Sequence, residues 1–393
     1  MKKIVFLFST IIFLTTSLYA NTAYQQERLA IDMYSQGYDL GESSDRQKAI
    51  KVFDKLIAKF QNSKNKKIQE QVAFAMYNKG YQLGELGKSQ EAINAYNKLI
   101  VKYQNSTNYE IQEEVAKAMR SKGYHLGELG KSQEAINAYN KLIAKFQNSA
   151  DYEIQEEVAM GMCSKGYELG EAKKYKESIG TYNKLIEKYK DYESEKIQEE
   201  VATAMYNKSY DLGELGMNNE AIVVCDNIIE RYQYYDNVEI QEQVAKAICG
   251  KGYAMEMLGR LEDALKIYDE LISKYKEFED DGVQEQVAMG MYNKSYSLGE
   301  LKRHKESIAV CDEIIVKYQD SQNEAIQEQV AFAMYNKGYE LEEIGKKEDA
   351  IKAYDELILK FKYSKNNSIQ KEVVKAINEK AYLLTELESQ NKH

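Results

Sequence analysis

The sequence contains no proline and no tryptophan, and its 393 residues include only three histidines and four cysteines. Because proline removes a backbone donor and breaks helices, a long chain without it is most easily built from helices and short loops. Hydrophobic residues make up 44% of the chain and charged residues 30%. This composition can form a core, so it excludes an intrinsically disordered protein.

Long apolar runs are also missing, except at the N-terminus. Lys2 and Lys3 precede an apolar stretch from Ile4 to Leu18, and Ala20 stands just before the sequence turns polar. This layout is typical of a secretory signal peptide, and the stretch is short for a membrane span. We predict a signal peptide at residues 1–20, cleaved after Ala20, and a periplasmic or secreted mature chain with no integral membrane segment. An uncleaved anchor is the alternative.

Positive charge is in deficit. The formal net charge is −10, and removal of Lys2 and Lys3 with the signal peptide would take it to −12. Nucleic acids and anionic membrane surfaces attract basic protein surfaces. We therefore expect no nucleic-acid partner.

What the sequence does contain is a unit of 43 residues that recurs without insertion or deletion. Each copy has a tyrosine that follows a small residue and precedes, by two positions, an apolar one. Nine copies in one phase exclude coincidence and indicate a tandem-repeat architecture. These register tyrosines are Tyr38, Tyr81, Tyr124, Tyr167, Tyr210, Tyr253, Tyr296, Tyr339 and Tyr382.

Each unit divides into two amphipathic helical patterns. In the third unit, apolar residues recur every three or four positions over residues 111–129 and again over 135–146. Between them, Gly130 predicts a left-handed C-terminal cap, and Ser132 predicts an N-cap for the second helix. One such pair cannot bury its apolar face alone, so adjacent pairs must stack. We predict an all-α solenoid of antiparallel helix pairs, with eight repeats over residues 21–366 and a C-terminal capping helix over 367–393.

A glycine near the middle of most first helices indicates close packing. Glycine costs about 1 kcal/mol relative to alanine inside a helix. We expect Gly80 and its equivalents to lie opposite the small residue of the second helix, represented by Ala92. Four residues after that small residue, we expect Tyr96 and its equivalents to fill the space between the two helices with a bulky side chain.

This pattern resembles the tetratricopeptide repeat. The family's small-residue position corresponds to Gly80, its leucine-glycine turn to Leu86 and Gly87, its second-helix alanine to Ala92 and its aromatic to Tyr96. The unit is longer than the family's usual ~34 residues and lacks the closing proline. The resemblance implies a right-handed superhelix whose first helices line the concave surface.

A lysine that recurs just before the small residue departs from the family, which has an apolar residue there. The lysines are Lys79, Lys122, Lys165, Lys208, Lys251, Lys294, Lys337 and Lys380. Two interpretations are open. The lysines form salt bridges with neighbouring acidic residues, or they line the groove and favour acidic peptides.

No group of residues has the pattern of a catalytic or metal site. His125 occupies a variable helix position, His304 a turn and His393 the terminus, so we expect all three to be exposed. Glycines lie within or at the ends of helices, which excludes a phosphate-binding loop. We predict that the protein is not an enzyme and binds no cofactor or metal.

The four cysteines are in phase with the repeat. They take positions that are tyrosine in other copies, and no CxxC pair is present, so zinc binding is poorly supported. We interpret them as smaller apolar replacements of core aromatics. Only Cys225 and Cys249 lie on consecutive helices, and a disulfide between these two is the alternative.

The resemblance implies that the concave face contains the register tyrosines and the position four residues before each. We expect the register tyrosines to be mainly buried between helices, and the earlier position to contact a partner. The predicted partner-binding residues are Tyr77, Arg120, Cys163, Tyr206, Cys249, Tyr292 and Tyr335. The predicted function is a cell-envelope scaffold that binds a protein or peptide. The alternative is an accessory subunit that binds glycan or peptidoglycan through its tyrosines.

Overall fold

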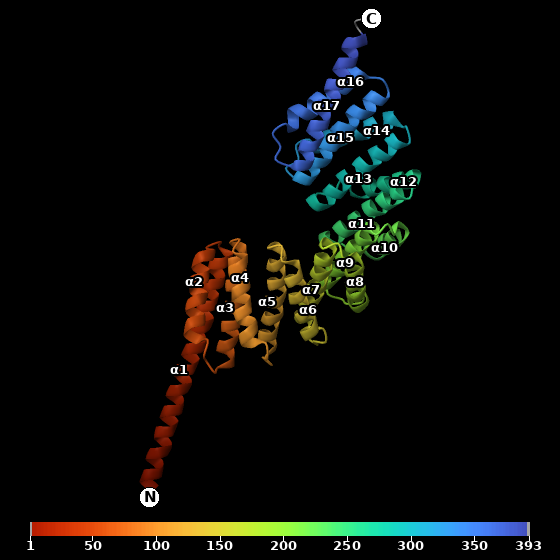
Figure 1. Cartoon of the computed structure of the whole chain (residues 1–393). Coiled ribbons are helices and arrows are strands. Elements are labelled where there is room, and N and C mark those ends of the chain that lie inside the picture. The colour runs from red at the N-terminus through yellow and green to blue at the C-terminus, as the bar shows by residue number, and fades with distance from the viewer. Residues whose placement is uncertain (1, 391–393) are drawn as a thin grey trace. The chain divides into compact units, whose positions relative to one another are not determined.

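The computed structural model describes the backbone of residues 2–390 and the side chains of residues 22–389. Over these residues the regular structure is entirely helical, which confirms the all-α prediction (Figure 1). Consecutive helices pack against one another as pairs. The side chains of the predicted signal peptide, as well as His393, lie outside the described residues. Among those described, no helix is both long and apolar enough to cross a membrane.

The chain folds as two compact units that divide between residues 197 and 198. In each unit, the first helices of successive repeats also pack together, for example α3 with α5 and α11 with α13. The first unit contains α1 (Lys2–Glu42), α2 (Arg46–Phe60), α3 (Lys66–Glu85), α4 (Ser89–Tyr103), α5 (Tyr109–Glu128), α6 (Ser132–Phe146), α7 (Tyr152–Glu171), α8 (Tyr175–Tyr189) and the start of α9 (Glu195–Glu214).

The second unit contains the rest of α9, followed by α10 (Asn218–Tyr232), α11 (Val238–Met257), α12 (Leu261–Tyr275), α13 (Asp281–Glu300), α14 (His304–Tyr318), α15 (Glu324–Glu343), α16 (Lys347–Phe361) and α17 (Asn367–Gln390).

The predicted C-terminal cap of the first helix is confirmed, whereas the predicted N-cap of the second helix is wrong. Gly130 has a φ of +70°, as its predicted role in a left-handed cap requires. Ser132, however, is the first residue of α6 and not its cap. Lys131 takes the cap position, and its side chain makes no capping hydrogen bond. First helices are capped by side chains instead, as where Asn108 accepts a hydrogen bond from the amide of Ile111.

Where a first helix has a glycine just before its register tyrosine, that glycine faces the aromatic ring of the second helix. A Cβ built on Gly123 would lie 2.5 Å from Cε1 of Tyr139, and its three nearest atoms all belong to that ring. The expected partner, Ala135, is therefore not the group that requires glycine. Where the ring is replaced by Cys225 or Cys311, the glycine is replaced by a serine. The two positions thus vary together, a larger residue replacing glycine where a smaller one replaces the ring.

A glutamine near the start of the first helices holds the loop that precedes it. The Gln155 amide nitrogen donates to the carbonyl of Ser149 at 2.9 Å, and the Tyr189 hydroxyl donates to Gln155 Oε1 at 2.6 Å. Gln241 and Tyr275 repeat the second contact at 2.6 Å in the other unit. The glutamine ties each loop to the next repeat, an arrangement that the sequence analysis missed.

The recurring lysine forms salt bridges with the preceding second helix in five repeats. Lys79 lies 2.5 Å from Asp54, and Lys251 lies 2.6 Å from Asp226. Lys294, Lys337 and Lys380 pair with Asp269, Asp312 and Asp355. The salt-bridge interpretation is confirmed for these five, so their charge is already neutralised within the fold.

Candidate functional site

The register tyrosines are exposed, and the expectation that they are mainly buried is wrong. Their exposed fractions run from 44% at Tyr81 to 58% at Tyr210. Successive residues of a helix point about 100° apart. Because Gly80 faces the aromatic ring of the second helix, the side chain of Tyr81 is turned away from that contact. The small residue thus packs inward and the tyrosine after it points outward, also where the small residue is Ser209 or Ser295.

One exposed tyrosine per repeat produces a row along each unit, since the first helices of successive repeats are neighbours. We call these two sets the tyrosine rows. The first unit's row is Tyr38, Tyr81, Tyr124 and Tyr167; the second unit's row is Tyr210, Tyr253, Tyr296, Tyr339 and Tyr382.

A glutamate stands one helical turn after nearly every tyrosine of the rows. Its charge raises the pKa of Tyr296 through Glu300 and of Tyr339 through Glu343. The exception is Met257, which follows Tyr253. The glutamates are Glu42, Glu85, Glu128, Glu171, Glu214, Glu300, Glu343 and Glu386. The rows are therefore both aromatic and acidic, and they suit a partner that carries apolar and basic groups.

The predicted partner-binding residues lie deeper than the rows. Cys163 and Cys249 are buried. The other five, Tyr77, Arg120, Tyr206, Tyr292 and Tyr335, are half-buried. Tyr77 packs against Tyr96 of its own repeat, with ring centroids 5.8 Å apart. These side chains pack within and between repeats, and their contact with a partner stays a prediction.

Arg120 is already engaged inside the first unit. Its Nε donates to Oε2 of Glu157 on α7 at 2.5 Å, and the side chains are only 23% and 10% exposed. Glu157 holds Arg120 charged, since the pKa of the guanidinium is raised by its carboxylate even against the opposing effect of burial. The pair links α5 to α7.

Glu114 is a buried carboxyl group beside this pair. Lys117 donates to its Oε1 at 3.2 Å, while Oε2 is buried with no hydrogen-bond partner among the described residues. Burial raises the pKa of Glu114 to about 7, an effect that the charge of Lys117 partly offsets. Glu114 is therefore about half protonated near neutral pH. In the second unit, the same position is a neutral glutamine at Gln243, Gln286 and Gln329 and a glutamate at Glu200 and Glu372.

The Glu114→Gln variant should remove a pH dependence of stability. With a pKa of about 7 in the fold and about 4.3 when unfolded, Glu114 binds more protons in the folded chain between these values, so stability falls as pH rises through that window. The variant should be more stable than wild type at pH ~8 by on the order of 2 kcal/mol and equal to it near pH ~4. Urea unfolding at both pH values measures this.

The exposed Glu110 of the same helix supplies the control, because Glu110→Gln should change stability equally little at both pH values. A Glu114→Gln effect of the same size at both pH values would contradict the assignment.

The histidines are less exposed than expected. His125 is buried against Gly84 of the preceding first helix, and its Nδ1 lies 2.8 Å from Oε2 of Glu128. His304 begins α14 with Nδ1 2.6 Å from Oε2 of Glu340. Among the residues whose side chains are described, no group of three or more His, Cys, Asp or Glu side chains is placed to hold a metal ion.

All four cysteines are buried and none is in a disulfide: Cys163, Cys225, Cys249 and Cys311. The disulfide between Cys225 and Cys249 is therefore not formed, and their interpretation as core replacements agrees with their burial.

Comparison with known proteins finds tetratricopeptide repeats in three segments of the chain. The family model for the tetratricopeptide repeat matches residues 74–106, 122–149 and 250–277, each of which covers most of one helix pair. No curated protein sequence matches the chain. The solved structure of the apo form of RapI is 11% identical and covers 92% of this chain and 99% of its own, with a TM-score of 0.59.

A tetratricopeptide repeat protein from Parabacteroides merdae ATCC 43184 is 13% identical and covers 78% of this chain and 98% of its own, with a TM-score of 0.46. At 11% identity, the likeness to RapI shows the fold alone: a solenoid of helix pairs.

Proposed function

We propose that this chain of tetratricopeptide repeats is a non-enzymatic scaffold that binds a protein or peptide on the face of its first helices. The observation that carries the proposal is the pair of tyrosine rows, which expose one large aromatic side chain per repeat. Exposed apolar groups that gather on one face mark interaction surfaces, and tyrosine is prominent among residues that dominate binding energy. Helical solenoids present such faces as extended binding surfaces.

The acidic residues beside the tyrosines limit the chemical kinds of partner that fit this face. A glutamate one turn from each tyrosine gives the face negative charge, with the single exception at Met257. An extended segment with alternating apolar and basic residues would meet both features. We place the scaffold in the cell envelope, on the N-terminal pattern of Lys2, Lys3 and the following apolar stretch. Fractionation of the source cells tests that location.

The proposal predicts that two tyrosines of the row are essential for binding. The mature chain should capture a protein partner from an envelope lysate, and the captured partner, once purified, should bind Tyr296→Ser/Tyr339→Ser at least ~10-fold more weakly. Both side chains are about half exposed, so the loss should occur without unfolding. Isothermal titration calorimetry measures the affinity and circular dichroism the fold.

A matched control changes two exposed tyrosines that lie outside the rows. Tyr234→Ser/Tyr363→Ser removes two side chains that are more than 80% exposed and should leave the affinity unchanged. Equal loss in both double variants would contradict a specific face. Purified glycan serves as the second bait. Binding of glycan with no protein partner would favour the alternative function, in which the rings stack on sugars.

A further inference from the structure

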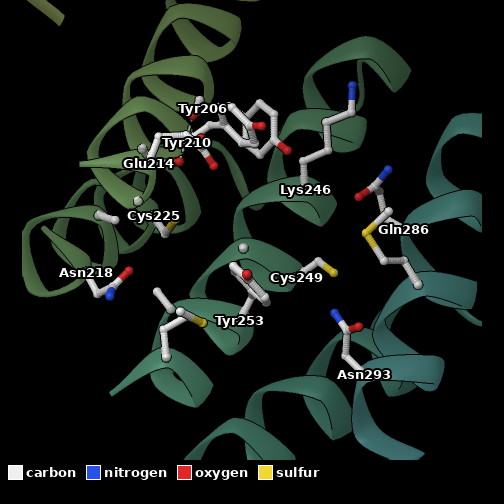
Figure 2. A pocket seen from close by; sticks show the side chains of 17 residues that line it. Tyr206, Tyr210, Glu214, Asn218, Cys225, Lys246, Cys249, Tyr253, Gln286 and Asn293 are labelled. Atoms are coloured by element: carbon white, nitrogen blue, oxygen red, sulfur yellow. Dashed lines mark hydrogen bonds between the residues drawn. The ribbon is translucent and has the colours of Figure 1, made fainter. Parts of the chain in front are cut away.

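A cavity of about 440 Å³ lies in the second unit, next to the first two tyrosines of its row. Side chains from α9, α10, α11 and α13 line it, and they include two exposed tyrosines of the row, Tyr210 and Tyr253. Figure 2 shows Tyr206 and Tyr210 on one side of this space. Cys225 and Cys249, which also line it, are buried. The cavity is therefore continuous with the proposed binding face.

The cavity exists because three neighbouring positions carry unusually small side chains. Cys225 takes a position that is tyrosine or phenylalanine in every other complete repeat except the one with Cys311. Cys249 takes a position that is tyrosine in most repeats. Gly250 takes a position that is asparagine or serine in the repeats before it and in the two that follow. No other pair of adjacent repeats has small residues at all three of these positions.

The repeat with Cys311 shows how the fold otherwise fills such a space. There the Asn336 amide nitrogen donates to Ser295 Oγ at 3.2 Å and lies 3.7 Å from Cys311 Sγ. Gly250 occupies the position equivalent to Asn336. A Cβ built on Gly250 would find only Cys225 Sγ within 4 Å, at 4.0 Å. The space beside Cys225 is thus left open where its counterpart is occupied.

The cavity has apolar, thiol and polar side chains in its lining. Burial raises the pKa of Cys225 to about 11 and of Cys249 to about 12, so both thiols are neutral at physiological pH. The nearby Lys246 amine is paired with Glu242 at 2.6 Å. The lining residues with apolar side chains or thiols include Ala221, Cys225, Cys249, Ala254 and Met289, and the polar ones include Glu214, Asn218, Gln286 and Asn293.

Aromatic pairing in other repeats indicates what fits. Tyr77 lies 5.8 Å from Tyr96, and Tyr335 lies 5.7 Å from Tyr354, measured between ring centroids. In the repeat with the cavity, Tyr206 is the counterpart of Tyr77, but the second ring of the pair is replaced by Cys225. A ring supplied from outside would restore the pair beside Tyr206.

We propose that this cavity receives an aromatic side chain, tyrosine or phenylalanine, of a peptide that lies along the tyrosine row of the second unit. The ring would pack against Tyr206 and the neutral sulfur atoms, where tilted aromatic pairs and sulfur–ring contacts are favourable. The side-chain amides of Asn218, Gln286 and Asn293 can accept a hydrogen bond from a tyrosine hydroxyl or donate one to it. This inference rests on the proposed function and names the anchor residue of its partner.

The test uses the full chain and p-cresol, the free side-chain analogue of tyrosine. We expect saturable binding to one site, with a dissociation constant on the order of 1 mM, reported by the isotope-labelled methyl signals of Met257 and Met289. The saturated analogue 4-methylcyclohexanol should bind at least ~5-fold more weakly, because it cannot form the ring pair. Equal affinity for both probes, or no saturable binding, would overturn the proposal.

Two variants close the cavity in different ways. Ser209→Gly/Cys225→Tyr rebuilds the combination found in most repeats, and Gly250→Asn rebuilds the arrangement beside Cys311; each should weaken p-cresol binding at least ~10-fold. Ser295→Gly/Cys311→Tyr makes the same exchange two repeats away and should leave binding unchanged. Undiminished binding by a folded cavity variant would overturn the proposal.

The proposed anchor site and the proposed scaffold function can be contradicted separately. A chain that binds its partner through the row but ignores p-cresol retains the proposed function and loses the anchor site. A chain that binds p-cresol in this cavity but captures no protein or peptide retains the site and loses the proposed function.

Discussion

Replacing Arg120 with alanine should lower the free energy of unfolding by about 3 kcal/mol. The substitution leaves the Glu157 carboxylate, 10% exposed, without the guanidinium that accompanies it into the interface between α5 and α7. Removing one partner of a buried ion pair costs more than the pair contributes, because the remaining charge stays desolvated. Urea unfolding at neutral pH measures the loss.

The chain itself suggests a variant that should recover this loss. In the second unit, the equivalents of Arg120 and Glu157 are tyrosine and glutamine at Tyr206 and Gln243, and again at Tyr292 and Gln329. The Arg120→Tyr/Glu157→Gln variant carries no buried charge and should unfold within about 1 kcal/mol of wild type. If Arg120→Ala leaves stability unchanged and weakens partner binding, Arg120 belongs to the binding face and not to the interface.

Replacing Gly123 with serine should destabilise the first unit by about 3 kcal/mol. The new Cβ would lie 2.5 Å from a ring carbon of Tyr139, which is 1% exposed and has no space to move into. Tyr139→Cys alone should cost about 3 kcal/mol through the cavity that it leaves. The Gly123→Ser/Tyr139→Cys variant reproduces the combination of Ser209 with Cys225. Its loss in the free energy of unfolding should be about 2 kcal/mol smaller than the sum of the losses of the two single variants.

Gly180 supplies the control for this cycle. It also lies in a helix of the first unit, but a Cβ there would meet no atom within 4 Å. Gly180→Ser should therefore leave stability unchanged or raise it by a few tenths of a kcal/mol, through better helix propensity. Strict additivity of Gly123→Ser and Tyr139→Cys, measured by urea unfolding, would contradict a direct contact between the two positions.

Much of the fold could be predicted from the repeat. The 43-residue period and the apolar spacing of three or four residues indicate helix pairs, because each helix must bury its apolar face against a neighbour. Gly130 has the positive φ that its position after the first helix predicted. Ser132 failed as a cap because α6 begins at the serine itself. Such one-residue shifts cannot be read from composition, since several polar residues near a helix start are equally able to cap.

The candidate site was harder to predict, because exposure depends on contacts between helices. The repeat pattern predicted that the register tyrosines are buried and that the position four residues earlier is accessible, whereas the register tyrosines are the more exposed set. A contact between Gly80 and the ring of Tyr96, 16 residues apart, decides which way Tyr81 points. The joint change of glycine to serine and tyrosine to cysteine was visible in the sequence, and it was the signal that could have revealed this contact.

By itself, the sequence determined the tandem architecture, its helical class and the absence of any catalytic pattern, because these follow from local periodicity and residue type. Only the tertiary structure decided that the register tyrosines form exposed rows, that Arg120 is held by Glu157, and that Cys225, Cys249 and Gly250 leave one cavity open. The physical reason is that each of these depends on side chains from two or three helices, far apart in the chain, competing for the same space.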